Sequence, residues 1–598
     1  MSRKRLIAIL LIAFTAQPPA YSEPVADAPA LDESGKFRLL LDTIWQWRLN
    51  RDPEFATEVG YPGNNDRWMD LSLKTIGEAK QQQREFLRQL HQINANALSR
   101  RGQLDLELIT WQFEMAVAAQ QYYQHYLQIN QLSGVHQTAE YILSNAPKSK
   151  LSDVEDMLKR LERLPKRVEQ TQILLKQGQQ KGITPPKVTL RDVKTQIMNL
   201  FPVNIEQSPL YKPFIDMPGN IENKQQKKLQ KKAQTLLKKK VYPAFTKLAN
   251  YLETDYIPNA REEVALSAIP NGTSWYQHQI KYHTSTSLNA SEIHAIGLAE
   301  VERIEKEMRQ IIQDSAFEGD RDAFVSFTNH DSRFFFTSPD ELVVAYRDIT
   351  KRADPELPKL FKTLPRLTYG VKAMPAYAEK SAPAAYYFPG ANSVGRPGYF
   401  LANTYDLKAR PKWEMEALSL HEAVPGHHLQ IAIAQELDGV HELLKHTHHT
   451  AFVEGWALYA ESLGTEMGFY QDAYSKFGQL NYEMWRAIRL VIDTGIHALG
   501  WTRQQAIDFF KQHSAKPQHD IIVEVDRYIV WPGQALAYKI GELKIKELRL
   551  RAEQMLGETF NIREFHDQVL QNGSVTLEVL EEVIDQWIAV QQGELVKN

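Results

Sequence analysis

The sequence predicts a large, mainly α-helical protein that carries one small antiparallel β-sheet. Stretches between residues 31 and 174 repeat apolar residues at the spacing of amphipathic helices. A segment between residues 386 and 401 instead combines aromatic strand formers with Pro-Gly turns. Further helix-compatible stretches follow and include a histidine-rich motif. We expect an N-terminal helical region over residues 23–270 and a second region over residues 271–598 that carries this motif, joined as one continuous body.

Composition indicates an ordinary globular protein. The 598 residues are 43% hydrophobic and 24% charged, with a formal net charge of -3, so the chain can bury a sizeable core and we expect no nucleic-acid partner. Residues 223–240 are strongly basic, but Leu229, Ala233 and Leu236 recur at helical spacing. We interpret this stretch as a solvated helix face; a nucleic-acid or membrane patch is the alternative.

The first 22 residues have the pattern of a secretory signal peptide. Three basic residues precede an apolar run over residues 6–16, and Ala-Tyr-Ser offers a cleavage pattern at residues 20–22. The apolar run is short for a membrane span, although an uncleaved anchor is an alternative. No cysteine is present, so neither a disulfide nor a lipid-bearing N-terminal cysteine is expected. We expect an exported, periplasmic or secreted protein without stable membrane insertion after cleavage.

Several elements can be placed before the motif. A long helix is predicted from Ser291 to Ile312 with Ser291 as its N-cap. The preceding stretch NGTSWYQHQIKYHTSTSL is compatible with a strand or an extended pocket wall. Residues 386–388 and 399–401 are expected to form an antiparallel pair. A helix beginning at Trp413 then leads directly into the motif.

The motif, HEAVPGHHLQ over residues 421–430, differs from the H-E-x-x-H form of zinc peptidases. In an unbroken helix, position i+6 points about 120° away and position i+7 lies roughly 10 Å along the axis, so the imidazoles could not converge on zinc. Pro425 and Gly426 favour a break that absorbs the extra residues. His427 then becomes the partner of His421. If the bulge absorbs three residues, His428 takes that place.

The third ligand is expected from another helix. TAFVEGWALYAESLG places Glu454 in an apolar helical setting, and Glu461, two turns later, is the weaker candidate. A buried carboxylate without a partner is costly, and a metal ion supplies a partner. We predict one zinc ion per chain on His421, His427 and Glu454, with Glu422 as the general base for metal-assisted hydrolysis.

Four segments together resemble the bacterial domain-of-unknown-function family 885, a zincin-like group: HEAVPGHH, FVEGWALYAE, RAIRLVIDTGIHALGW and WPGQALAYKIGELKI. The resemblance covers most of the chain and extends more distantly to the thimet-oligopeptidase and carboxypeptidase-Taq peptidases, from whose H-E-x-x-H the inserted Val-Pro departs. It implies a helical gluzincin body with a small sheet beside the metal helix and a substrate channel. It also implies that Tyr538 stabilises the oxyanion, with ordinary packing as the alternative.

The same resemblance suggests residues that bind substrate. Arg489 and Arg486 lie at helical spacing, and a guanidinium can clamp a carboxylate; internal ion pairing is the alternative. Arg489 is the first choice. Three residues complete the set: Lys539, His497 and Asn403.

These observations favour a zinc-dependent hydrolase, and the resemblance makes it a metallopeptidase that cleaves short peptides or C-terminal residues. The expected partner is a peptide or small amide substrate. One alternative is an amidase acting on a non-peptide or cell-wall-derived amide, and another is a catalytically silent peptide-binding protein. The histidines between residues 441 and 449 are expected in a connecting loop, where their irregular spacing specifies no second metal site.

Overall fold

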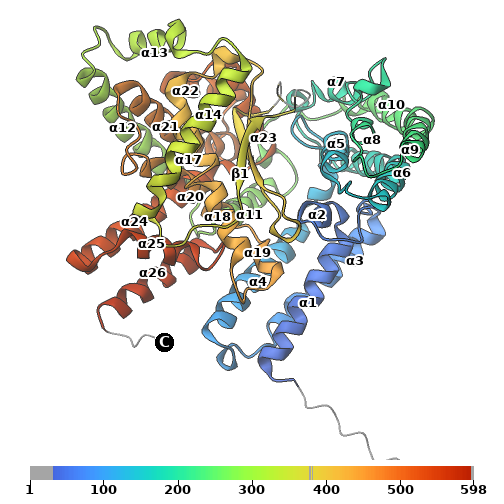
Figure 1. The fold of residues 1–598 in the computed structure, drawn as a ribbon, viewed down its shortest axis with the longest axis horizontal. Coiled ribbons are helices and arrows are strands. Elements are labelled where there is room, and N and C mark those ends of the chain that lie inside the picture. The colour runs from blue at the N-terminus through green and yellow to red at the C-terminus, as the bar shows by residue number, and fades with distance from the viewer. Residues whose placement is uncertain (1–30, 376–378, 380–381, 594–598) are drawn as a thin grey trace, which may run out of the picture.

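The computed structural model describes residues 31–375, 379 and 382–593, and Figure 1 shows its arrangement. The predicted signal segment, residues 1–22, lies outside the described residues. The predicted mainly helical architecture is confirmed, with one three-stranded sheet. No helix in the described part of the chain is long and apolar enough to cross a membrane.

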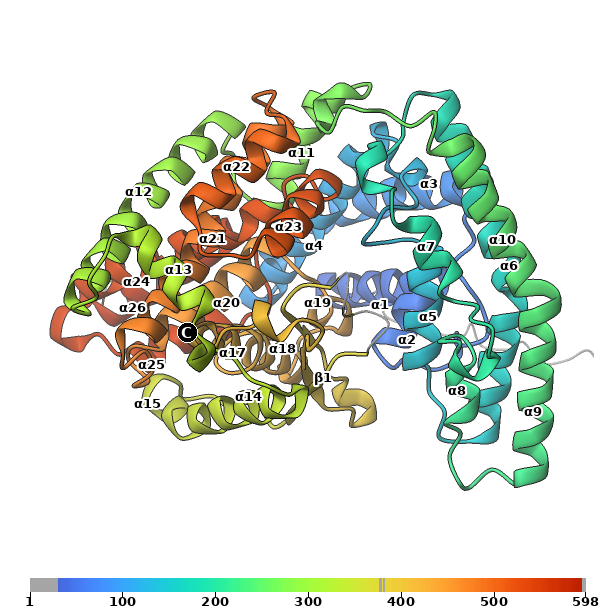
Figure 2. The ribbon, with the colours of Figure 1, turned by 90° about the horizontal axis from the view of Figure 1, so that it is seen from above.

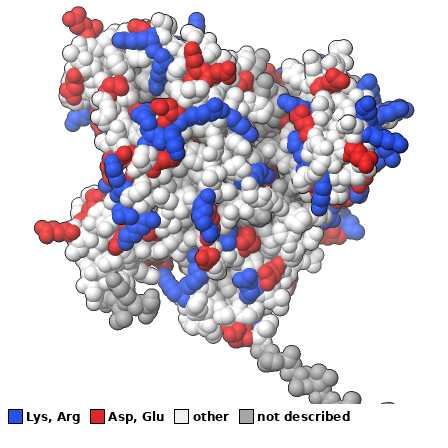
Figure 3. Space-filling model, in the orientation of Figure 1, with Lys and Arg blue, Asp and Glu red and all other residues white. Residues whose placement is uncertain are grey.

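The first ten helices make up the N-terminal part, as the amphipathic spacing predicts. Their bounds are α1 Glu33–Arg51, α2 Pro53–Glu58, α3 Leu73–Leu90, α4 Arg100–Ala118, α5 Val135–Asn145, α6 Leu151–Gln180, α7 Val193–Met198, α8 Lys212–Ile215, α9 Asn223–Leu236 and α10 Tyr242–Tyr251. Helix α9 buries its apolar face while its lysines are exposed, and the basic side chains gather at the edge of the molecule beside α9 and α10 (Figures 1 and 3). The expected solvated helix face is therefore observed.

The remaining elements form the larger C-terminal part. Before the motif lie α11 Gly272–Thr284, α12 Ala290–Asp314, α13 Arg321–His330, α14 Pro339–Ala353, α15 Leu357–Leu360, β1 Tyr369–Ala373, β2 Ala385–Phe388 and β3 Gly398–Ala402. From the motif onward lie α17 Met415–Glu422, α18 His427–Glu436, α19 Glu442–Lys445, α20 Thr450–Leu463, α21 Ala473–His497, α22 Arg503–His513, α23 Gln518–Val530, α24 Ala537–Leu556, α25 Ile562–Leu570 and α26 Leu577–Gln591.

The hydrophobic cores do not divide at residue 270. Helices α1, α3 and α4 share one large core with the C-terminal helices. A second core lies between α5, α6 and the helices up to α10, which form a separate layer at one side of the molecule (Figure 2). The N-terminal helices α1 and α4 therefore help to build the body that carries the motif.

Two predicted elements differ in the structure. The long helix begins at Ala290 with Asn289, not Ser291, as its N-cap. The Asn289 side chain accepts from the next helical N–H groups while the Glu292 carboxylate accepts from the Asn289 N–H, so the two residues form a capping box. The undecided stretch before it is helix α11, because Trp275 and Ile280 share a buried face whose packing outweighs their β propensity.

The sheet has the order β1-β3-β2. The predicted antiparallel pairing of β2 with β3 is confirmed, with Tyr387 opposite Phe400. Strand β1 was not predicted; it pairs with β3 in parallel, so the sheet is mixed rather than wholly antiparallel. Phe400 is fully buried against Tyr346 of α14, with ring centroids 4.8 Å apart. Helices α14 and α17 pack beside the sheet, which brings its strands next to the motif.

Helices α20 and α24 contact each other closely at Gly455 and Gly541. A Cβ on Gly455 would lie 2.5 Å from the Gly541 backbone, and one on Gly541 would lie 1.9 Å from the carbonyl oxygen of Ala451. Only residues without a side chain allow this close approach. The contact fixes Glu454, the neighbour of Gly455, relative to Tyr538 near the start of α24.

Candidate metal centre

The motif forms two helices joined by a short turn. Helix α17 ends at Glu422, α18 begins at His427, and the predicted break lies between them. Gly426 is required by space, because a Cβ there would lie 1.9 Å from the carbonyl oxygen of His421. The Trp456 indole donates to the Pro425 carbonyl at 2.9 Å, which ties the turn to α20. The break thus holds both histidines against the helix that carries Glu454.

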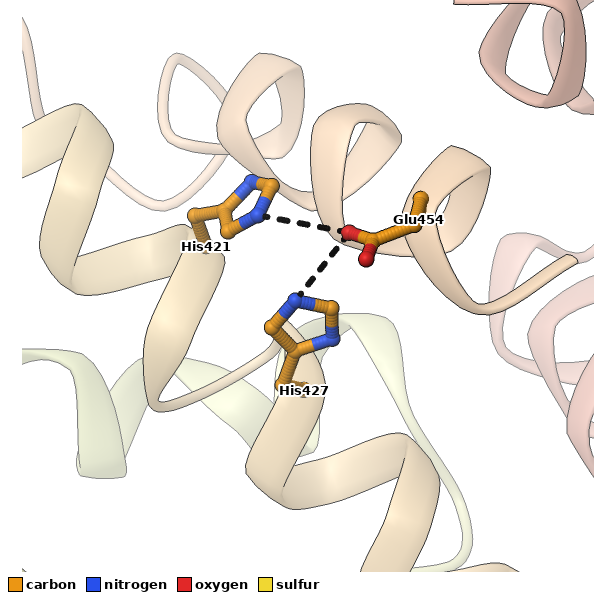
Figure 4. A group of neighbouring side chains, drawn as sticks. All are labelled: His421, His427 and Glu454. Carbon is orange, nitrogen blue, oxygen red and sulfur yellow. Dashed lines mark ion pairs between the residues drawn. The ribbon is translucent and has the colours of Figure 1, made fainter. Parts of the chain in front are cut away.

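Three side chains converge across this junction (Figure 4). Glu454 Oε2 lies 3.9 Å from His421 Nε2 and 3.4 Å from His427 Nε2. One ligand atom from each residue lies within 4.8 Å of the other two. The structure therefore brings together the three residues predicted as metal ligands.

The donor set fits a divalent metal ion. Glu454 Oε2 is buried and has no hydrogen-bond partner among the described residues. Burial raises the pKa of Glu454, but His427 together with Arg527 and Arg489 lowers it further, so the net shift favours the carboxylate. Two imidazole nitrogens and one carboxylate oxygen are a ligand set typical of catalytic zinc. A buried carboxylate oxygen that has no hydrogen bond and faces two imidazoles is the arrangement that a cation stabilises.

His428, the alternative ligand, points elsewhere. Its Nδ1 lies 2.8 Å from the Tyr387 hydroxyl, and its ring packs on Tyr369 with centroids 4.5 Å apart. Burial lowers its pKa to about 4. The turn therefore directs His427 toward Glu454 and His428 toward the sheet.

Glu461, the weaker candidate for the third ligand, contacts the ring nitrogen of His421 that does not face Glu454. Its Oε1 lies 2.8 Å from His421 Nδ1 and 3.0 Å from Arg486 Nη2. A proton on Nδ1 donated to this carboxylate leaves the Nε2 lone pair facing Glu454. Burial, followed by the charge of Arg486, holds the pKa of His421 well below its usual range, so the ring is neutral. Glu461 is therefore a positioning residue for His421.

We predict that Glu461→Gln weakens zinc binding by about 10- to 100-fold, because the acidic partner that orients the His421 ring is lost. Competition with a chromophoric chelator measures the affinity. Glu442→Gln is a matched control, since Glu442 is exposed and pairs with Lys445 and His446, which lie close to it in the chain. Equal affinities of the Glu461 variant and the unaltered protein would show that the carboxylate has no positioning role.

A cavity of about 370 Å³ opens beside these residues. Glu422 lines it, and burial raises the pKa of this carboxyl to about 7, opposed mainly by His427. An acid that exchanges its proton near neutral pH is suited to general acid–base work. The cavity is also lined by the three candidate ligands, by strand β2 and by Arg486, Arg489, Arg527, Trp531 and Tyr538.

Tyr538 faces the cavity with its hydroxyl held from one side. Its ring lies parallel to that of His421, with centroids 6.3 Å apart, and the Arg489 guanidinium covers the ring at 4.3 Å. Arg527 Nη2 donates to the hydroxyl oxygen at 3.0 Å and Gln534 Nε2 at 3.4 Å. Because both neighbours donate, the hydroxyl hydrogen of Tyr538 is free to donate to another group.

The two predicted arginine clamps have internal carboxylate partners. Arg489 Nη2 lies 3.0 Å from Glu524, whereas Arg486 pairs with Glu461. Arg489 Nη1 is buried without a hydrogen-bond partner in the described part of the chain. Both arginines line the cavity, so each guanidinium group forms an internal ion pair and also contributes to the cavity wall.

Three predicted substrate contacts lie outside the residues that line this cavity. Lys539 is fully buried and pairs with Glu483 and Glu542, at 2.8 and 2.6 Å. His497 is also fully buried; its ring nitrogens lie 2.9 Å from the Leu266 amide nitrogen and 3.0 Å from the Tyr528 carbonyl oxygen. The structure therefore gives both side chains internal partners in place of a substrate.

Asn403 has a supporting position as well. Its amide nitrogen donates to the carbonyl oxygens of Glu379, Ala382 and Pro383. Pro383 lines the cavity, so Asn403 holds part of the wall and does not itself face the space.

Sequence reasoning did not single out Arg527 and Trp531, although both line the cavity. Arg527 precedes the segment WPGQALAYKIGELKI, and Trp531 is its first residue. Tyr538 of the same segment was predicted as a site residue. The signal available in the sequence was an arginine one helical turn before a tryptophan. Their relation to Tyr538 depends on the turn between α23 and α24.

Comparison with known proteins identifies a family whose function is described as unknown. The profile of a family described as "Bacterial protein of unknown function (DUF885)" matches residues 53–584. A solved protein from Colwellia psychrerythraea, described as a candidate lipoprotein, is 26% identical, with a TM-score of 0.90 over 94% of this chain and 100% of that one. A candidate lipoprotein of unknown function from Shewanella oneidensis shares the fold at 17% identity, with a TM-score of 0.70 over 93% of this chain and 100% of that one. The comparison with curated proteins found no match.

Proposed function

We propose that this chain, which belongs to the DUF885 family of bacterial proteins, is a metal-dependent hydrolase with a zincin-like centre that cleaves short peptides or C-terminal residues. The observation that carries the proposal is the buried oxygen of Glu454, which has no hydrogen bond in the described part of the chain and faces the imidazoles of His421 and His427 at a cavity wall. Zinc is the metal that this donor set suits best.

The proposed roles follow from the positions of the side chains. His421, His427 and Glu454 would hold the ion, and a bound divalent ion supplies Lewis-acid chemistry that polarises a carbonyl group and lowers the pKa of water. Glu422, beside a ligand and facing the cavity, accepts the proton of the attacking water and passes it to the leaving amine.

Tyr538 is proposed as the oxyanion donor. Arg527 and Gln534 both donate to its hydroxyl oxygen, which leaves the phenolic hydrogen available for a developing negative charge in the cavity. The unpartnered Nη1 of Arg489 supports a contact with a substrate carboxylate. A peptide with a free C-terminus would therefore meet a proton acceptor, an oxyanion donor and a guanidinium in one cavity.

We also propose that the protein is exported to the periplasm. The basic, apolar and small-residue pattern of the first 22 residues supports export. The descriptions of both solved relatives as candidate lipoproteins agree with it. The site then works in a compartment where short peptides and cell-wall fragments are available as substrates.

Metal removal tests the function directly. We predict about one divalent ion per purified chain, loss of peptide cleavage after chelator treatment and recovery on addition of zinc, because the ion activates the water. The measurements are elemental analysis and mass spectrometry of a digested peptide library. Cleavage that persists in the metal-free protein would overturn the proposal. Cleavage confined to non-peptide amides would identify an amidase, and binding without turnover a silent peptide-binding protein.

A further inference from the structure

A second and larger cavity adjoins the first. It has a volume of about 710 Å³, within the range of roughly 300–1,000 Å³ typical of ligand sites. It lies between the end of α4, helix α11 and the turn that leads from α23 to α24, elements that lie near one another in Figure 2. Trp531 lines both cavities. A ligand that extends from the candidate metal centre past Trp531 therefore enters this second space.

Trp531 is held at the junction by a fixed turn. Gly533 has φ +83°, a conformation that favours glycine, and its N–H donates to the buried Asp493 at 3.0 Å. Asp493 also accepts from the Tyr276 hydroxyl of α11 at 2.6 Å. Gln534 lines the second cavity, and its side-chain oxygen accepts a hydrogen bond at 2.8 Å from Arg527, which lines the first cavity. The tryptophan is thus presented by a turn that is anchored on both sides.

The lining of the second cavity is mostly uncharged. Among the described residues, Arg261 is the one permanently charged residue that lines it. Its guanidinium is occupied by backbone carbonyl oxygens, among them Thr184 at 2.9 Å and Ala265 at 2.7 Å. Burial lowers the pKa of His278, and that of His283 to about 4, so both rings are neutral at neutral pH. A cationic side chain placed here finds no carboxylate among the lining residues and loses water, which is unfavourable.

Exposed aromatic side chains face this cavity. Trp531 is 40% exposed and Tyr282 is 39% exposed, although both are large. Tyr282 is supported from behind by Trp111, with ring centroids 6.3 Å apart and planes at 13°. Rigid aromatic rings on a concave surface give a ligand large apolar contact at a low entropic cost. Amides from Gln83, Gln124 and Gln279 add neutral hydrogen-bonding groups.

From these features we infer that the second cavity binds the part of an extended peptide substrate that lies away from the cleaved bond, and that it selects against cationic side chains there. Trp531 is the specificity-determining residue at the junction. This inference rests on the proposed peptidase function for its substrate class. The site itself depends on a different set of residues from those that would hold the metal.

The experiment compares two peptides with the same terminal sequence at the cleaved bond. One has two residues; the other has six, extended with one alanine, one glutamine, one leucine and one phenylalanine. Titration calorimetry measures binding to the whole protein, and kinetics measure cleavage. We expect the long peptide to bind about tenfold to a hundredfold more tightly, because it buries aromatic and apolar groups in the second cavity. A lysine in the extension removes that gain, because the cavity lining offers it no carboxylate. Extension at one end or the other identifies the side that enters.

Three variants test whether the tighter binding of the long peptide depends on the second cavity. Ala119→Trp fills the second cavity and should make the long and short peptides bind alike, whereas Ala118→Trp, at the exposed neighbouring position, should keep the difference. Trp531→Ala should lower the gain by about tenfold, and its exposed position makes it the safer variant should Ala119→Trp fail to fold. Thermal melts compare the folding of all three.

The outcomes separate the two ideas. Equal binding of both peptides to the unaltered protein, or a difference that survives both Ala119→Trp and Trp531→Ala, overturns the inference even if cleavage occurs. Length-dependent binding without any cleavage overturns the proposed hydrolase and keeps the second cavity as a peptide-binding site.

Discussion

Glu422→Gln is expected to lower kcat for peptide cleavage by about 10²- to 10⁴-fold while the protein keeps its metal. Glutamine has nearly the shape of glutamate but cannot take a proton from water. Glu422 faces the cavity next to His421 without belonging to the group that converges on Glu454. A loss in kcat without loss of metal therefore separates proton transfer from metal binding.

The measurement pairs steady-state kinetics with elemental analysis of the same sample. Glu416→Gln is a suitable control, because Glu416 lies on the same helix and binds the Tyr470 amide and Arg352, away from the cavity. Unchanged kcat in the Glu422 variant would remove this residue from the mechanism. Loss of metal would instead make Glu422 a ligand.

His427→Ala is expected to abolish zinc binding and with it all activity. The loss of affinity should exceed the roughly 10- to 100-fold typical when only an outer partner of a ligand is removed. Zinc at about 100 times its Kd should stabilise the unaltered protein by about 2.7 kcal/mol, and this gain should vanish in the variant. Denaturation with and without zinc measures the gain, and each variant is compared with its own metal-free form.

The neighbouring histidine is a matched control. His428→Ala removes the contact with Tyr387, which lowers the free energy of unfolding, but His428 is turned away from Glu454. It should therefore retain the stabilisation by zinc. A result in which His428→Ala loses zinc and His427→Ala keeps it would reverse the assignment and contradict the geometry of the turn.

Much of the fold follows from local sequence patterns. Apolar spacing predicts the helices, and the aromatic segments with Pro-Gly turns predict the β2–β3 pair. These patterns work because helices and strands bring neighbours in the chain onto one face. Helix α11 is the exception, since its β-forming residues adopt a helix only through the burial of Trp275 and Ile280 against other elements. Strand β1 likewise depends on a distant partner.

The candidate site divides in the same way. By itself the sequence determined that two histidines and Glu454 could share an ion, because the Pro-Gly break and the apolar surroundings of the glutamate are local features. The tertiary structure alone decided between His427 and His428, since one turn directs them to opposite sides. It alone made Glu461 the partner of His421, and placed Lys539 and His497 among internal partners.

The sequence alone does not predict the second cavity. It unites the end of α4 with the turn after α23, segments about 400 residues apart that carry no shared pattern. Residue type and spacing determined which chemistry the chain could perform. Packing between distant helices decided which groups face one another, because contacts across the fold depend on how whole elements pack and not on the neighbours of each residue along the chain.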